Sequence, residues 1–284
     1  MSSNSKIEWT DHTFNPWIGC TRISPGCDGC YAAVSTPARA MKVIWGATEP
    51  RHRTAPSTWK QPLAWHRGHE AFFAQHGRRQ RVFCASLADV FDNAVDPQWR
   101  EDLFALIREC ENLDWLLLTK RIGNVASMLP WKGEAEHWPH VRIGITLTSQ
   151  AELERDLLKL IALGGPNFVS AEPLLGPLDF TAEYFTKKLG SYPFKGLPSE
   201  HRTRLIHLVD WLIVGGESGP HARPMHRDWA RSLRDQCGDA GVQFFFKQWG
   251  AYIPVSDSGE EIRRVGKEAA GRLLDGREWN GVPS

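Results

Sequence analysis

The chain has 284 residues, of which 42% are hydrophobic and 24% charged, and its formal net charge is +1 at pH 7. This composition is ordinary for a soluble globular protein, and the near-zero charge excludes a global electrostatic case for nucleic-acid binding. No apolar run is long enough to cross a membrane, and the N-terminus lacks the apolar core of a secretory signal. We therefore expect a cytoplasmic location, where thiols stay reduced.

The first distinctive stretch is a glycine-rich loop that carries three of the six cysteines, Cys20, Cys27 and Cys30. A short strand is expected before it, within residues 6–17. Three thiolates on one short loop can ligate an iron–sulfur cluster, and three protein ligands leave one iron open. They can also bind zinc if a fourth ligand joins them, for which His12 is the nearest candidate. The spacing leaves both possibilities open, together with three reduced thiols or one disulfide and a spare thiol.

The segment after this loop lacks a regular hydrophobic pattern. Residues 31–40 predict a short helix that Pro37 breaks, and residues 46–81 predict a basic connecting region of loops and short helices. Between Arg51 and Arg81 there are seven Lys or Arg, four His and one acid, with tryptophan and phenylalanine interleaved. Such a stretch can track a phosphate backbone and stack on bases, or it can be a solvated connection.

A regular alternation of apolar strands and amphipathic helices then begins. Asp96 and Pro97 predict a helix start, and Ser149 with Glu152 predicts a capping box. The six clear strands are expected at residues 81–87, 114–119, 141–148, 167–171, 210–214 and 243–246.

Repeated strand–helix units with apolar strands indicate parallel pairing with helices outside. We predict an α/β fold, a partial or complete (βα) barrel of about six to seven parallel strands. The sequence indicates a single domain over residues 1–284, with the cysteine loop near its N-terminus. An insertion at 177–208 and a polar C-terminal extension at 250–284, expected to form a hairpin or a wrap, complete this domain.

Polar side chains follow the predicted strands at the end where a (βα) barrel places its chemistry. Their convergence indicates a functional pocket, although caps and turn residues also gather at strand ends. Gly215 and Gly216 permit close backbone approach to a ligand, without the spacing of a dinucleotide-binding fold. The polar side chains, in chain order, are Ser86, Asp89, Thr119, Lys120, Arg121, Thr146, Thr148, Glu172, Glu217, Ser218, Lys247 and Gln248.

The cysteine loop, the strand series and the polar strand ends together resemble the radical S-adenosylmethionine (SAM) superfamily. That superfamily commonly has C-x3-C-x2-C, whereas this chain has C-x6-C-x2-C, with Gly29 where an aromatic is usual. A closer resemblance runs almost end to end, to a phage-associated bacterial family with a three-cysteine motif and no settled activity. It rests on the stretches IEWTDHTFNPWIGCTRISPGCDGCYA, LADVFD, LLLTKR, SAEPLLGPLD, WLIVGGESG and FFFKQWG.

The radical SAM resemblance implies a set of roles for residues of this chain. Cys20, Cys27 and Cys30 would hold a [4Fe–4S] cluster, and Asp89 would receive the methionine ammonium group of SAM. An electron donor such as flavodoxin or ferredoxin would reduce the cluster, and the 5′-deoxyadenosyl radical would abstract hydrogen from a nucleic acid or nucleotide. Further SAM-binding residues would be Ser86, Gly215, Gly216 and Ser218. Catalytic residues on the substrate side would be Lys120, Glu172, Glu217 and Lys247.

Two other functions fit the same residues. A zinc-stabilised module would bind nucleic acid or a partner protein without catalysis, using His12 and the three loop cysteines. A metal-independent hydrolase would use Glu172 and Glu217 as an acid and base pair, with a structural cysteine loop.

Overall fold

The structure is a computed structural model that describes residue 5 and residues 7–131, 137–181, 205–255 and 261–283. Most of the predicted insertion at 177–208 lies outside the described residues. The chain divides into two compact units. Unit 1 comprises residues 1–144, 163–166 and 284, and unit 2 comprises residues 145–162 and 167–283.

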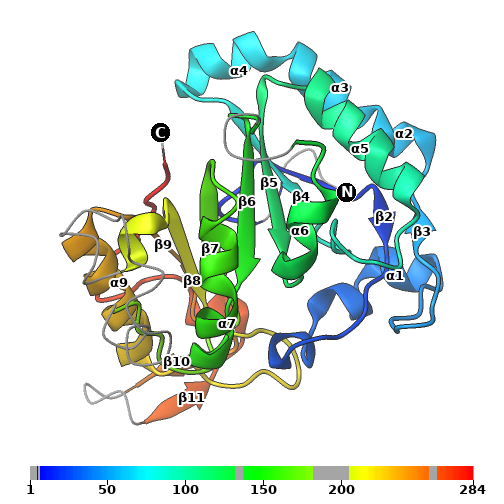
Figure 1. Ribbon diagram of the computed structural model, residues 1–284. Coiled ribbons are helices and arrows are strands. Elements are labelled where there is room, and N and C mark those ends of the chain that lie inside the picture. The colour runs from blue at the N-terminus through cyan, green and yellow to red at the C-terminus, as the bar shows by residue number, and fades with distance from the viewer. Residues whose placement is uncertain (1–4, 6, 132–136, 182–204, 256–260, 284) are drawn as a thin grey trace. The chain divides into compact units, whose positions relative to one another are not determined.

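Seven strands are hydrogen-bonded in the order β1-β4-β5-β6-β7-β8-β9 (Figure 1). Adjacent strands are parallel within each unit, which confirms the prediction of an α/β partial barrel with six to seven parallel strands. The strands of this sheet are β1 (His12–Phe14), β4 (Gln80–Cys84), β5 (Leu113–Thr119), β6 (Val141–Thr146), β7 (Asn167–Ala171), β8 (Trp211–Gly215) and β9 (Gln243–Gln248).

Two short antiparallel pairs stand beside this sheet. In unit 1, β2 (Trp17–Ile18) pairs with β3 (His52–Arg53). In unit 2, β10 (Tyr252–Pro254) pairs with β11 (Ile262–Arg264), so part of the C-terminal extension pairs as a hairpin does.

Helices connect the strands within each unit. Those of unit 1 are α1 (Thr36–Ala40), α2 (Pro56–Trp59), α3 (Gln61–Arg67), α4 (His69–His76), α5 (Pro97–Glu109) and α6 (Ile122–Met128). Those of unit 2 are α7 (Gln150–Ile161), α9 (Arg227–Ala240) and α10 (Lys267–Ala270). Single turns of 3-10 helix span Pro25–Cys27, Tyr31–Val34 and Leu205–Leu208.

Local signals explain most helix ends, with two exceptions. The Asp96 carboxylate accepts the Gln98 N–H at 2.9 Å at the start of α5, as the sequence predicted. Pro37 does not break a helix. It lies in the first turn of α1, where a backbone N–H would have no acceptor within the helix, so its absence in proline costs no hydrogen bond. The capping box at α7 is also wrong, because the Glu152 carboxylate accepts from the backbone N–H and hydroxyl of Thr148, both at 2.7 Å.

Aromatic side chains fill the core of each unit. In unit 1, Phe14 makes edge-on contacts with Trp59 and Trp115, at centroid distances of 5.8 and 5.9 Å. In unit 2, Trp211 makes an edge-on contact with Phe245 and a tilted contact with Phe168, at centroid distances of 6.3 and 5.9 Å. These side chains bury large apolar areas and fix the strands that carry the candidate site residues. Within the described ranges, no helix is both long and apolar enough to span a membrane.

Candidate functional site

The cysteine loop of unit 1 begins beside the carboxyl ends of parallel strands. Gly19 forms a parallel bridge with Ala88, just beyond β4, and its N–H donates to the Leu87 carbonyl at 3.1 Å. Its φ of +115° is a conformation that an L-residue rarely adopts, which explains the glycine before Cys20. The loop therefore leaves the sheet at the edge where the sequence placed the polar residues.

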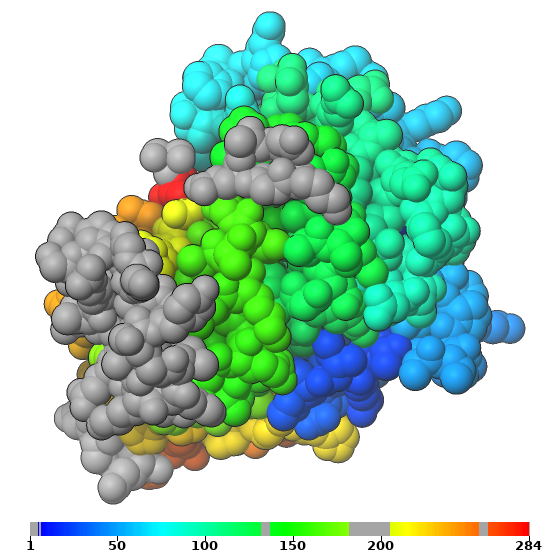
Figure 2. All heavy atoms as spheres, in the orientation of Figure 1, coloured from blue at the N-terminus to red at the C-terminus, as the bar shows by residue number. Residues whose placement is uncertain are grey.

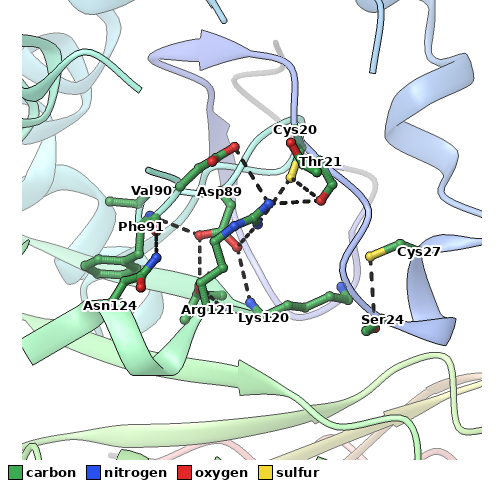
Figure 3. Close-up of polar contacts among 12 residues, drawn as sticks. Cys20, Thr21, Ser24, Cys27, Asp89, Val90, Phe91, Lys120, Arg121 and Asn124 are labelled. Atoms are coloured by element: carbon green, nitrogen blue, oxygen red, sulfur yellow. Dashed lines mark hydrogen bonds and ion pairs between the residues drawn. The ribbon is translucent and has the colours of Figure 1, made fainter. Parts of the chain in front are cut away.

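Asp89, which follows β4, is a buried hub of this edge (Figure 3). Its Oδ1 accepts from the Thr119 hydroxyl at 2.8 Å and from the Phe91 N–H at 3.0 Å. Its Oδ2 accepts from the Lys120 N–H at 3.2 Å and from Arg121 Nη1 at 3.0 Å. Four donors from the chain itself therefore satisfy the carboxylate that was expected to receive the SAM ammonium group.

Arg121 links this hub to the cysteine loop. Its Nη1 also donates to Cys20 Sγ at 3.4 Å, and its Nη2 donates to the Thr21 carbonyl at 2.9 Å. Nη2 also lies 3.7 Å from the carboxylate of Asp92. Burial opposes the charge of Arg121, but the carboxylates of Asp89 and Asp92 outweigh it and raise the pKa of the guanidinium.

A second buried arginine completes the network, and sequence reasoning had assigned it only to the basic stretch. Arg51 donates through Nε and Nη2 to Asp92 Oδ2, at 2.9 and 2.7 Å, and its side chain is 1% exposed. Its Nη2 also donates to the Thr21 hydroxyl at 2.6 Å. Asp92 was missed as well, although it ends the LADVFD stretch, three residues after Asp89. Two arginines and two aspartates thus compensate each other's charge out of contact with water.

The three loop thiols are free, and the structure holds them differently. Cys20 is half-buried; burial raises the pKa of its thiol to about 11, with the charge of Arg121 acting in the opposite direction. Cys27 is buried and donates to the Ser24 hydroxyl at 4.0 Å, within a turn that Ser24 caps. Cys30 is half-buried, and its N–H donates to the Cys27 carbonyl at 3.3 Å.

These donors fit a thiophilic metal or cluster by their chemistry. Three soft thiols on one loop are ligands that iron–sulfur clusters and zinc accept. Among the described residues, no three His, Cys, Asp or Glu side chains are gathered as metal ligands. Figure 3 shows Cys27 turned to Ser24 and apart from Cys20. The loop therefore supplies three suitable donors, and binding of a metal or cluster has to bring their sulfurs together.

His12 does not join the cysteines as the zinc reading required. It lies in β1, with Nε2 2.7 Å from Gln80 Oε1, and its ring stacks on Trp65 at a centroid distance of 4.1 Å. His12 and Gln80 are the first residues of β1 and β4, whereas Cys20 follows Gly19, which pairs beyond the carboxyl end of β4. A zinc site that uses the three cysteines needs a different fourth ligand.

The basic stretch is largely neutralised by acids from other parts of unit 1. Arg53 pairs with Asp102 at 2.7 Å, and Arg78 pairs with Asp11 at 2.6 Å. Arg53 also lies over the ring of Trp59, 4.3 Å from its centroid, so cation and aromatic side chain contact each other. These cations are therefore engaged within the fold, and their charge is not free to track a phosphate backbone.

Ser86, the remaining SAM-binding candidate of unit 1, belongs to a small polar cluster. Its hydroxyl accepts from the Asn15 amide at 3.0 Å, and Asn15 Oδ1 accepts from the Leu87 N–H at 2.7 Å. The Tyr31 hydroxyl, from the turn after Cys30, donates to the Ser86 carbonyl at 3.0 Å. Ser86 thus ties the far end of the cysteine loop to the end of β4.

In unit 2, two of the candidate catalytic residues form an ion pair at strand ends. Lys247 of β9 lies 3.1 Å from Glu172 Oε1, just beyond β7, and both side chains are less than one-fifth exposed. The Ser170 hydroxyl donates to Glu172 Oε2 at 3.4 Å. The pair can exchange a proton with a bound molecule or orient a polar group, because it retains partial access to solvent.

The other candidate acid, Glu217, is held tightly by its own loop. The Arg223 backbone N–H and Nε donate to Glu217 Oε2 at 2.9 and 2.8 Å, and Nη2 donates to Oε1 at 2.7 Å. Burial raises the pKa of Glu217, but the bonds from Arg223 outweigh it, and the net shift lowers the pKa. Glu217 is therefore ionised at neutral pH, which does not suit the general acid of the hydrolase reading. Ser218 follows it, half-buried.

Gly215 and Gly216, where we expected close backbone approach to a ligand, lie close to groups of the chain itself. A Cβ on Gly215 would lie 2.4 Å from Glu172 Oε1, and a Cβ on Gly216 would lie 2.0 Å from the Trp249 carbonyl oxygen. The first contact involves the tip of a side chain and the second involves backbone.

We expect Gly216→Ala to destabilise the protein by about 2–3 kcal/mol, because the backbone at Trp249 cannot move away without distorting the end of β9. Gly215→Ala should cost less, because the Glu172 carboxylate can rotate. Urea unfolding of both variants tests this order. Gly238→Ala, with open space around its Cβ, is the control and should not lower stability. Equal losses at Gly215 and Gly216 would contradict the argument.

Comparison with solved structures finds likenesses to spore photoproduct lyase. One is a form with a cysteine-to-alanine substitution, at a TM-score of 0.43 and 10% identity over 84% of this chain and 74% of that chain. Another is a doubly substituted form with bound AdoMet and dinucleoside spore photoproduct, at a TM-score of 0.40 and 12% identity over 79% of this chain and 60% of that chain. Both likenesses are distant in sequence and structure.

No curated protein matches the chain. A family described as "Protein of unknown function (DUF5131)" matches over residues 4–283, which is nearly the whole length. The protein therefore belongs to the DUF5131 family.

Proposed function

We propose that the protein is a radical SAM enzyme that holds a [4Fe–4S] cluster with Cys20, Cys27 and Cys30 and acts on a nucleic acid or nucleotide. The observation that carries this proposal is the loop of three free thiols that starts at the carboxyl ends of the parallel strands of unit 1. Three cysteine ligands leave one iron of such a cluster open for SAM. When bound, the cluster would supply the electron that cleaves SAM. A donor such as flavodoxin or ferredoxin would supply that electron to the cluster.

The chain's own residues would bind and orient the cofactor and the substrate. Asp89 has to exchange one of its four internal hydrogen bonds to receive the SAM ammonium group, and the bond from the Lys120 N–H is the longest of them. Ser86, Gly215, Gly216 and Ser218 are the other proposed SAM-binding residues. Lys120, Glu172, Glu217 and Lys247 are the proposed catalytic residues on the substrate side.

The proposed substrate class rests on exposed cations near the cysteines. Arg22 lies on the cysteine loop and Arg39 and Lys42 lie on and just beyond α1, and all three are exposed. These side chains suit a phosphate-bearing substrate better than the paired arginines of the basic stretch do. Figure 2 shows that the chain segment at the dark-blue end of the colour bar reaches the surface. A cytoplasmic location would keep the thiols reduced.

Metal analysis of protein purified without oxygen tests the proposal. We expect about four irons and four sulfides per chain, and a visible spectrum that changes when SAM is added. One zinc per chain without iron would refute the radical mechanism and favour the zinc-stabilised binding module. Iron without a spectral response to SAM would refute the open iron site.

A further inference from the structure

Cys20 differs from Cys27 in what holds its sulfur. The Cys27 thiol contacts Ser24, three residues earlier in the same loop. The Cys20 sulfur accepts a hydrogen bond from Arg121, which is 101 residues further along the chain and follows β5. A side chain fixed to the sheet therefore reaches out to the first cysteine of the motif.

The geometry points to Arg121 as the positioning residue of the cysteine loop. We propose that it fixes Cys20 before any metal binds and keeps a positive charge beside this sulfur when the cluster is present. The first part concerns the metal-free chain. The second part rests on the proposed function, because it requires a cluster.

The guanidinium has little freedom to do anything else. Arg121 is 9% exposed in its side chain, and Asp89 binds its Nη1 while Asp92 lies beside its Nη2. Both aspartates are themselves fixed, Asp89 by three other donors and Asp92 by Nε and Nη2 of Arg51, which both donate to its Oδ2. Because the guanidinium is planar and several partners fix it, the N–H groups that reach Cys20 and Thr21 point in a fixed direction. A group that positions a metal ligand requires this property.

Arg121 and Arg51 together clamp the residue that follows Cys20. Arg121 Nη2 donates to the Thr21 carbonyl and Arg51 Nη2 donates to the Thr21 hydroxyl, at 2.9 and 2.6 Å. Thr21 is thus bound by two charged donors, one at its backbone carbonyl and one at its side-chain hydroxyl. Charge-assisted hydrogen bonds are the stronger ones in proteins, so this end of the loop is preformed. The later cysteines follow on local turns that can rearrange around a metal.

An arginine that only stabilises the fold should not affect Cys20, and Arg100 is a matched control of this kind. Arg100 of α5 is 7% exposed and supports the same 89–92 segment, with Nε donating to the Val90 carbonyl at 2.9 Å and Nη2 donating to the Asp92 carbonyl at 2.8 Å. No bond from Arg100 to Cys20 or Thr21 is present among these contacts. Arg100→Gln therefore weakens the segment without removing the donor to the cysteine.

The experiment compares Arg121→Gln, Arg121→Lys and Arg100→Gln with the wild type. In the metal-free protein, hydrogen exchange of the Gly19 and Gly46 amides should become about tenfold faster in Arg121→Gln, as expected for the loss of a charge-assisted bond. The Gly19 N–H donates to the Leu87 carbonyl at 3.1 Å, and the Gly46 N–H donates to the Cys20 carbonyl at 3.2 Å. Arg100→Gln should leave these amides near the wild-type rate after its global stability is taken into account. The exchange rates in Arg121→Lys should lie between those of Arg121→Gln and Arg100→Gln, because lysine is a charged donor but lacks the planar guanidinium with its several N–H groups.

In the iron-loaded protein, redox titration of the cluster measures the effect of the charge. The reduction potential should become more negative in Arg121→Gln, because a positive charge near a ligand sulfur favours the reduced cluster. It should stay near the wild-type value in Arg121→Lys and in Arg100→Gln. Equal exchange rates in Arg121→Gln and Arg100→Gln, with unchanged potentials, would overturn the inference. If the wild type binds no iron, the proposed function fails, while the exchange rates still decide whether Arg121 positions Cys20.

Discussion

Replacing Cys20, Cys27 and Cys30 together by alanine should abolish iron binding, and each single replacement should lower the iron content to less than half. A [4Fe–4S] cluster with three protein ligands cannot stay bound at full occupancy when one thiolate is lost, because water or solvent thiols are weaker ligands. The fold should survive, since Cys20 and Cys30 are half-buried and Cys27 lies in a single turn of 3-10 helix. Iron and sulfide analysis after anaerobic purification measures the effect.

Cys237 is the matched control for this result. It is fully buried on α9, in unit 2, and burial raises the pKa of its thiol far above the ordinary range. Cys237→Ala should cost about 1 kcal/mol of stability through the small cavity it leaves, and it should retain the full iron content. The idea of a cysteine-loop cluster would be abandoned if the triple variant bound as much iron as the wild type.

The parallel sheet was predictable because apolar runs of strand length stand out from the helices between them. β7 begins and ends at the residues the sequence indicated, and the ends of β5 and β6 agree within two residues. β1 could not be placed in the same way, because it has three residues and its pairing with β4 depends on contacts across the chain. Short strands carry too few residues to show alternation, so tertiary pairing decides where they lie.

The strand-end positions of several candidate residues were predictable, but their contacts were not. The rule that polar groups collect at the carboxyl ends of parallel strands agrees with the positions of Asp89 and Arg121 in unit 1 and of Lys247 in unit 2. It did not show that Asp89 is already saturated with internal donors, because three of the four come from Thr119, Lys120 and Arg121, about thirty residues further along the chain. The role of Arg51 was hidden for the same reason. In the sequence it is one cation of a basic stretch, whereas in the fold it binds Asp92, 41 residues away.

The basic stretch shows how a composition signal can mislead. Residues 51–81 hold a single acid among many cations, but Asp11, Asp102 and Asp114 from elsewhere in unit 1 approach these cations. Ion pairs between distant segments cannot be read from a window of sequence. Exposed pairs of this kind contribute little stability, so they neutralise charge more than they hold the fold together.

Asp89→Asn should destabilise the protein by about 3–5 kcal/mol, the range expected when one partner of a buried ion pair is removed. The asparagine oxygen can still accept from Thr119 and the Phe91 N–H, which now bind Oδ1. Its amide nitrogen then faces the two donors that now bind Oδ2, the Lys120 N–H and Arg121 Nη1. The amide nitrogen cannot accept a hydrogen bond, so it repels these two donors and leaves them without an acceptor at position 89. Arg121 then has only the Asp92 carboxylate, 3.7 Å away, as an ion-pair partner among these residues.

Asp102→Asn is the control, since the ion pair of Asp102 with Arg53 is shorter, at 2.7 Å against 3.0 Å for Asp89 with Arg121, but has about a third of each side chain exposed. Exposed pairs are worth roughly 0–1 kcal/mol, so this variant should unfold in urea close to the wild type. Tryptophan fluorescence reports both transitions. A loss at Asp89 no larger than that at Asp102 would mean that the buried network is not a main source of stability.

The same variant separates a structural role of Asp89 from a role in binding SAM. If Asp89 only organises Arg121, then Asp89→Asn studied at a temperature and urea concentration where it stays folded should bind SAM with near wild-type affinity once it is loaded with iron. If Asp89 also receives the ammonium group, the affinity should fall by about tenfold or more, because a charge-assisted hydrogen bond is lost from the ligand itself. Equilibrium binding of SAM to the folded variant distinguishes these results. The Asp89 carboxylate already accepts from four donors within the chain, and the SAM ammonium group would be a fifth. The affinity of the variant for SAM therefore shows whether one of these internal bonds is exchanged when the cofactor binds.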